Sequence, residues 1–130
     1  MIKLVVFDLD GVLVEAKDFH YEALNRALEL IDEKYVIGRD EHLAKFDGLS
    51  TKKKLQKLTV EKGLPPDTYN TIWENKQKFT HRVIEDRVCF EDHVRISSAL
   101  RRLKAEGYTV YCASNSIRSS VKMMLIRAGY

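Results

Sequence analysis

The segment that most constrains this chain is residues 4–11, which read Leu-Val-Val-Phe-Asp-Leu-Asp-Gly. Four apolar residues without polar alternation are typical of a strand that is buried on both faces of a parallel sheet. Asp8 and Asp10 follow at the carboxyl end of this strand, and Gly11 permits a sharp turn there. Because open α/β sheets bind ligands beyond the carboxyl ends of their strands, the segment predicts a site at that edge.

The pattern that follows is helical up to residue 88. Apolar residues recur at helical spacing, with glycine or proline between the segments, near 19–32, 41–46, 50–63 and 67–83. Beyond this stretch we expect a helix near 92–106, a second strand over 108–113 and a final helix. The residues Ser114-Asn115-Ser116 are expected to cap that final helix.

This order of elements predicts an α/β fold with an inserted domain. The expected core consists of residues 1–15 and 89–130, and the expected insertion is an all-helical cap over 16–88. With 130 residues the chain is long enough for one modest core and a small insertion.

Composition excludes several classes of protein. A net charge of +3 is far from that of a dedicated nucleic-acid binder, and no run approaches the ~18 apolar residues of a membrane span. The start, Met1-Ile2-Lys3, has no leader pattern. Cys89 and Cys112 lack metal-binding spacing, so we expect reduced thiols and a cytoplasmic protein.

The paired carboxylates suggest phosphoryl-transfer chemistry. One carboxylate can bind a hard cation such as Mg²⁺ and attack an electrophile, while the other moves a proton. The alternative interpretation of Asp8 and Asp10 is a pair of turn-forming aspartates. The Ser-Asn-Ser segment at the end of the second strand offers hydroxyl and amide donors to an anion, although an ordinary helix cap would use the same residues.

These residues resemble a known family. Residues 7–13, Phe-Asp-Leu-Asp-Gly-Val-Leu, resemble the first motif of the haloacid dehalogenase (HAD) superfamily, and Ala-Ser-Asn-Ser over 113–116 resembles its second. The helical block resembles the cap of the subfamily that includes β-phosphoglucomutase and phosphoglycolate phosphatase. His20 and residues 46–50 also resemble segments of that cap. The resemblance implies a HAD-like, Rossmann-like parallel-sheet core.

The resemblance also implies roles for individual residues. Asp8 would be the nucleophile that forms an aspartyl-phosphate, and Asp10 would act as the general acid and base. Mg²⁺ would be held by the Asp8 carboxylate and the Asp10 backbone carbonyl. Ser114 and Asn115 would bind the phosphoryl group of a small phosphate ester. These roles imply a Mg²⁺-dependent phosphatase.

Basic residues in the expected cap suggest further substrate contacts. Lys52 begins a run of three lysines, and His20 lies near the start of the first expected helix. Either could contact substrate, although a solvated helix face is the simpler interpretation of the lysines. Thr51 stands where related sugar-phosphate mutases carry an arginine, which argues against mutase-like recognition.

The family's third and fourth motifs, a lysine and an acidic pair, have no match before Tyr130. We therefore expect the N-terminal part of a longer phosphatase. We also expect its incomplete core to form homo-oligomers or to exchange elements between chains. Two alternatives remain: a non-catalytic binding or interaction subunit with a truncated HAD-like fold, and a sugar-phosphate mutase.

Overall fold

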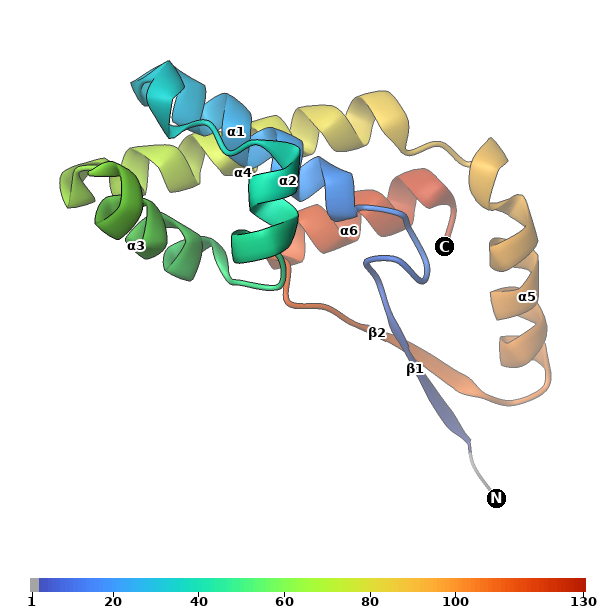
Figure 1. Ribbon diagram of the computed structural model, residues 1–130. Helices are drawn as coiled ribbons and strands as arrows, with labels where there is room; N and C mark the ends of the chain where they lie inside the picture. The colour runs from blue at the N-terminus through green and yellow to red at the C-terminus, as the bar shows by residue number, and fades with distance from the viewer. Residues whose placement is uncertain (1–2) are drawn as a thin grey trace. The chain divides into compact units, whose positions relative to one another are not determined.

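The computed structural model describes residues 3–130, and none of the helices in that range is long and apolar enough to cross a membrane. The chain forms two compact units (Figure 1). One unit runs up to Phe19 and resumes at Thr80–Tyr130, and the other is His20–Phe79. Each unit has its own cluster of buried apolar side chains.

The boundaries of the units differ from the 15/16 and 88/89 expected from the sequence. Phe19, Val83, Ile84 and Val88 are buried in the apolar cluster of the first unit. The helical segments that carry them therefore contribute to that core. The assignment of the two units as catalytic core and cap stays a prediction.

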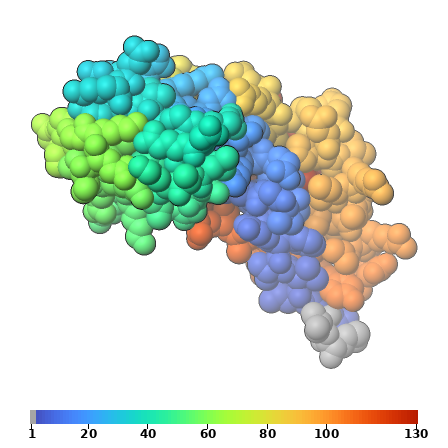
Figure 2. Space-filling view, viewed as in Figure 1, coloured from blue at the N-terminus to red at the C-terminus, as the bar shows by residue number. Residues whose placement is uncertain are grey.

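The first unit contains the strands and the helices that flank the second strand, namely β1 (Leu4–Asp8), η4 (Glu91–His93), α5 (Val94–Ala105), β2 (Thr109–Ala113) and α6 (Arg118–Ala128). The two strands lie side by side (Figures 1 and 2) and pair in parallel, from Leu4 opposite Thr109 to Asp8 opposite Ala113. A parallel pair needs a long crossover connection, and residues 9–108 provide it. The expected α/β fold is confirmed.

The prediction that the first strand is buried on both faces is wrong. Leu4 and Val6 are 50% and 54% exposed, whereas Val5 and Phe7 on the opposite face are half-buried. Side chains alternate between the faces of a strand, and within residues 3–130 the packing partners cover the Phe7 face. β2 shows the same alternation, with Tyr111 60% exposed.

The core of the first unit forms around the loop that follows β1. Leu9 is fully buried, and side chains from other segments of the unit pack in the same cluster. These buried residues are Leu13, Val14, Ala16, Phe19, Val83, Ile84, Val88, Met124 and Ala128. Phe7 and Cys112 of the sheet pack against this cluster. The cluster thus fixes the position of the chain directly after the first strand.

The second unit is built of helical segments alone within the described residues. Its elements, two of which extend into the first unit, are α1 (Lys17–Ile31), η1 (Glu33–Tyr35), α2 (Arg39–Glu41), η2 (His42–Phe46), α3 (Thr51–Lys62), η3 (Pro66–Thr68) and α4 (Tyr69–Arg87). The buried side chains include Leu24, Leu28, Phe46, Leu58 and Ile72.

Local capping chemistry explains the bounds of α3. Ser50 is its N-cap, and the hydroxyl of Ser50 accepts a hydrogen bond from the Lys53 amide at 3.3 Å. Gly63 ends the helix in the left-handed conformation, with φ +71°. Both features agree with the sequence prediction for this helix.

Candidate active site

The parallel register brings the two sequence motifs to one edge of the sheet. Asp8, the last residue of β1, pairs with Ala113, the last residue of β2. Asp10 and Ser114 lie just beyond these strand ends. Asp8 is exposed, and Asp10 and Ser114 are half-buried. Carboxylates and a hydroxyl therefore gather where α/β sheets bind their ligands.

A tight loop holds the two aspartates on either side of Leu9. The carbonyl oxygen of Leu9 accepts hydrogen bonds from the amides of Val12, Leu13 and Val14 at 3.2, 3.0 and 3.0 Å. The Leu9 amide donates to Asp8 Oδ1 at 2.8 Å, which orients that carboxylate. Because Leu9 is fully buried, the loop is anchored to the core at the residue between the two carboxylates.

Gly11 allows this loop to turn. Its φ is +78°, a left-handed conformation that other residues adopt at a cost, and its amide donates to the Val14 carbonyl at 2.8 Å. The turn expected at Asp10-Gly11 is therefore present, and it directs the chain away from the sheet edge.

The prediction that Ser114-Asn115-Ser116 cap the final helix is wrong. α6 begins at Arg118, and its N-cap is Ile117, which makes no side-chain capping bond. The Ser114 hydroxyl instead accepts a hydrogen bond from the Ser116 amide at 3.1 Å, which closes a local turn before the helix. Since that hydroxyl acts as an acceptor, its own proton can be donated to a ligand oxygen.

The charge at this edge acts on a neighbouring thiol. Burial raises the pKa of the Cys112 thiol, and the carboxylates of Asp8 and Asp10 raise it further. Cys112 lies in β2, opposite Phe7. The two aspartates therefore create a negative field at the carboxyl end of the sheet.

The donors present suit a hard cation. Within residues 3–130 there is no group of three or more His, Cys, Asp or Glu side chains that could hold a metal ion. Mg²⁺ needs less than this, because it retains several waters and is commonly held by one or two carboxylates together with substrate phosphates. The oxygen donors of Asp8 and Asp10 fit this requirement.

The other expected site residues lie in the second unit. His20 is half-buried on α1, and Lys52 is exposed in the first turn of α3. Their contact with substrate stays a prediction. In the same unit, Lys54 Nζ lies 3.2 Å from His42 Nε2. Helical spacing offered a signal for Lys54, which precedes the buried Leu58 by four residues.

The fold and site define a class of protein: an α/β protein with paired carboxylates at the carboxyl ends of parallel strands and a helical unit inserted after the first strand. The chain belongs to the haloacid dehalogenase-like hydrolase family, which it matches over residues 5–130. The family predicted from residues 7–13 and 113–116 is thus confirmed. No curated protein matches the sequence significantly.

Solved structures share this fold. CbbY from Rhodobacter sphaeroides, in complex with phosphate, superposes with a TM-score of 0.79 at 18% identity, over 100% of this chain and 59% of that protein. A conserved haloacid dehalogenase-like protein of unknown function from Agrobacterium tumefaciens superposes with a TM-score of 0.68 at 25% identity, over 99% of this chain and 54% of that protein. A family IA HAD hydrolase from Entamoeba histolytica superposes with a TM-score of 0.72 at 14% identity, over 99% of this chain and 56% of that protein. The chain therefore spans a little over half the length of these proteins.

Proposed function

We propose that this chain provides the nucleophile and the phosphate-binding hydroxyl of a Mg²⁺-dependent phosphatase that acts on a small phosphate monoester. The observation that carries the proposal is the pairing of Asp8 with Ala113, which sets Asp8, Asp10 and Ser114 at one sheet edge. Membership of a hydrolase family supports the same reaction type.

The proposed chemistry assigns one role to each residue. The Asp8 carboxylate attacks phosphorus, and the bond from phosphorus to the ester oxygen breaks. Asp10 donates a proton to that oxygen, so the alcohol leaves uncharged and Asp8 carries an acyl phosphate. Asp10 then takes a proton from water, which attacks phosphorus and releases inorganic phosphate and free Asp8.

Two further groups would steady the phosphoryl oxygens. The Ser114 hydroxyl and the Asn115 amide are hydrogen-bond donors next to the strand end, where they would bind these oxygens. When bound, Mg²⁺ would neutralise charge on the same oxygens, which lets a carboxylate approach phosphorus. Asp8 and Asp10 are the residues that would hold the cation.

The proposed substrate class is supported by the solved relatives. CbbY has been crystallised with phosphate, and a mutant of that protein with xylulose-1,5-bisphosphate. A small phosphorylated metabolite is accordingly the proposed substrate of this chain, in the cytoplasm.

The test is hydrolysis of p-nitrophenyl phosphate by the 130-residue chain, with Mg²⁺ and with a chelator. We expect Mg²⁺-dependent turnover, and a loss of at least about 10³-fold in Asp8→Asn, because the nucleophile is removed. Asp18→Asn, at an exposed position of α1, is the matched control and should keep full activity. Absence of turnover from a folded chain would contradict the proposal that this chain is catalytic by itself.

A further inference from the structure

The two carboxylates of the candidate active site are held by different parts of the first unit. Asp8 ends β1, where it pairs with Ala113 of β2. Asp10 lies beyond the sheet, in the loop, where it forms an isolated bridge with Val14. The Gly11 amide also donates to the Val14 carbonyl at 2.8 Å. The position of Asp10 therefore depends on the segment around Val14, whereas the sheet fixes Asp8.

A side chain from the other end of the sequence holds that segment. The hydroxyl of Tyr130 donates at 2.7 Å to the carbonyl of Leu13, the residue before Val14, and Figure 1 shows the C-terminus beside this loop. Burial raises the pKa of the Tyr130 hydroxyl, so this group stays protonated and able to donate at neutral and mildly alkaline pH. Because a hydrogen bond depends on both distance and direction, the contact restrains the backbone at Leu13.

Tyr130 is itself anchored by several contacts. Its amide donates to the Leu125 carbonyl of α6 at 2.9 Å. The carbonyl of the preceding Gly129 accepts a hydrogen bond from the hydroxyl of the buried Ser97, also at 2.9 Å. The ring of His93 packs edge to face on the Tyr130 ring, with an interplanar angle of 90°. The Tyr130 hydroxyl thus reaches the loop from a fixed position.

We propose that Tyr130 is a positioning residue for the general acid Asp10, an inference that rests on the phosphatase function proposed above. The Tyr130 hydroxyl holds Leu13, and through the bridge to Val14 it keeps the Asp10 carboxyl within reach of the ester oxygen. A general acid must lie within hydrogen-bond reach of the oxygen that it protonates, so a small displacement of the loop weakens proton donation. Asp8 does not need this support, because its strand is paired with β2.

The need for proton donation depends on the leaving group of the substrate. Phenol, like the tyrosine side chain, has a pKa of about 10, so phenolate is a poor leaving group unless its oxygen is protonated as the bond to phosphorus breaks. p-Nitrophenol is more acidic, and its anion leaves with little help from an acid. A displaced Asp10 therefore slows hydrolysis of phenyl phosphate more than hydrolysis of p-nitrophenyl phosphate. A smaller fraction of folded protein would slow both equally.

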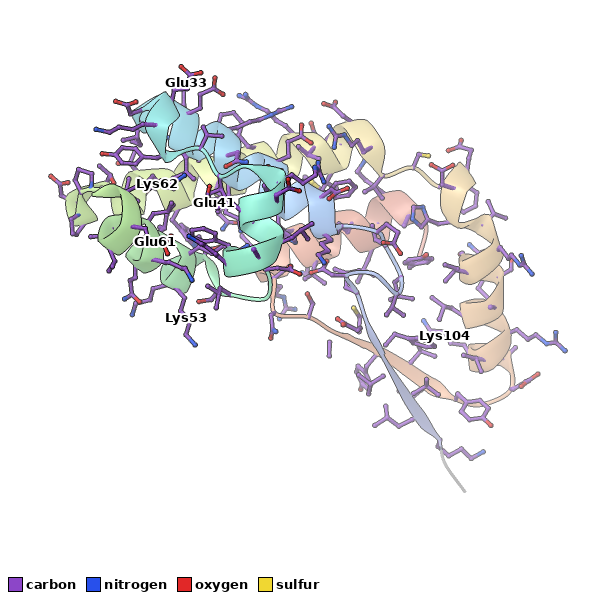
Figure 3. The ribbon with its side chains drawn as sticks, in the orientation of Figure 1. Glu33, Glu41, Lys53, Glu61, Lys62 and Lys104 are labelled. Carbon is purple, nitrogen blue, oxygen red and sulfur yellow. The ribbon has the colours of Figure 1, made fainter. Side chains whose placement is uncertain are left out.

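The test compares kcat/KM of the 130-residue chain for these two substrates with Mg²⁺. Tyr130→Phe should lower kcat/KM for phenyl phosphate by roughly tenfold and for p-nitrophenyl phosphate by less than about twofold. Asp10→Asn is the reference variant and should show the same preference with a larger loss. Tyr108→Phe, at another half-buried tyrosine of the unit, is the matched control, and Lys104→Gln changes an exposed side chain of α5 (Figure 3). Neither control should lower either value.

The two substrates separate the role of Tyr130 from the phosphatase function. Equal losses with both substrates in Tyr130→Phe, or no loss with either, would overturn the role of Tyr130 and leave the phosphatase function standing. The same preference in Tyr108→Phe would also overturn that role, because the effect would then not depend on the bond to Leu13. If the unaltered chain shows no hydrolysis that depends on Asp8, both proposals are wrong.

Discussion

The hydroxyl of Tyr130 donates a hydrogen bond to the carbonyl oxygen of Leu13 at 2.7 Å. This bond ties the last residue of the sequence to the loop that carries Asp8 and Asp10. The ring of His93 packs edge to face on Tyr130, with centroids 5.8 Å apart, and supports the contact. Tyr130, which lies 117 positions after Leu13 in the sequence, therefore stabilises this loop.

Removing this hydroxyl should loosen the loop. Tyr130→Phe keeps the ring and leaves the Leu13 carbonyl without its donor, so we expect a loss of about 1 kcal/mol in the free energy of unfolding. Urea unfolding measures the loss, and hydrogen exchange should quicken at the amides of residues 12–14. Tyr108→Phe, in another half-buried tyrosine of the first unit, is the control. Equal exchange in the two variants would contradict the role of Tyr130.

The contrast between buried Leu9 and exposed Val6 gives a second prediction. Leu9 is fully buried, so Leu9→Ala should cost about 2–5 kcal/mol of unfolding free energy through lost burial and the cavity left behind. Val6 is 54% exposed, so Val6→Thr should change stability by less than about 0.5 kcal/mol. Urea unfolding of both variants provides the measurement. A cost for Val6→Thr close to that of Leu9→Ala would mean that the Val6 face is covered in solution.

The backbone conformation of the turn at Gly11 gives a third prediction. Gly11 has φ +78°, so Gly11→Ala should destabilise the chain by about 1–2 kcal/mol, although open space surrounds the position. Gly38 also lies in open space and has φ −65°, which alanine adopts readily. Gly38→Ala should therefore have little effect. Thermal unfolding compares the two, and equal stability would show that the loop does not need the left-handed conformation.

The reactivity of the Cys112 thiol provides a measure of the negative charge at the candidate active site. Because burial and the two carboxylates raise the pKa of Cys112, its thiolate fraction near pH 8 is lower than that of a free cysteine. Asp8→Asn removes one negative charge, so the pKa should fall and alkylation by iodoacetamide should become faster.

Cys89 is the internal control for this experiment. Its pKa is raised chiefly by the hydrogen bond from its thiol to Asp92, at 3.0 Å, so Asp8→Asn should leave its alkylation rate unchanged. Mass spectrometry of the two cysteine peptides between pH 7 and 9 gives both rates. An unchanged rate at Cys112 would show that Asp8 does not act on this thiol.

Local chemistry made much of the fold predictable. The apolar run before Asp8, the cap at Ser50 and the left-handed Gly63 all act over a few residues, and each has the expected role. The exposure of Leu4 and Val6 depends on which other segments pack against the sheet, and hydrophobic runs do not carry that information. Periodicity therefore identified the strand but not its open face.

The positions of the candidate residues were predictable where motif and topology coincide. The pairing of Asp8 with Ala113 follows from two parallel strands, so Asp10 and Ser114 meet at one edge as expected. The predicted helix-capping role of Ser114 is wrong because its hydroxyl accepts a hydrogen bond within a local turn. The contact of Lys54 with His42 could not be predicted from the run of lysines, because only the tertiary structure brings one of them against His42.

The most direct test of the proposed phosphatase function is chemical identification of the phosphorylated residue. The chain is mixed with p-nitrophenyl phosphate and Mg²⁺, quenched in acid during turnover and reduced with borohydride, which converts an acyl phosphate to an alcohol. We expect peptide mass spectrometry to find this reduction at Asp8, and we expect the chelator to abolish it. Phosphate release without reduction at Asp8, or reduction at Asp10 instead, would contradict the role of Asp8 as nucleophile.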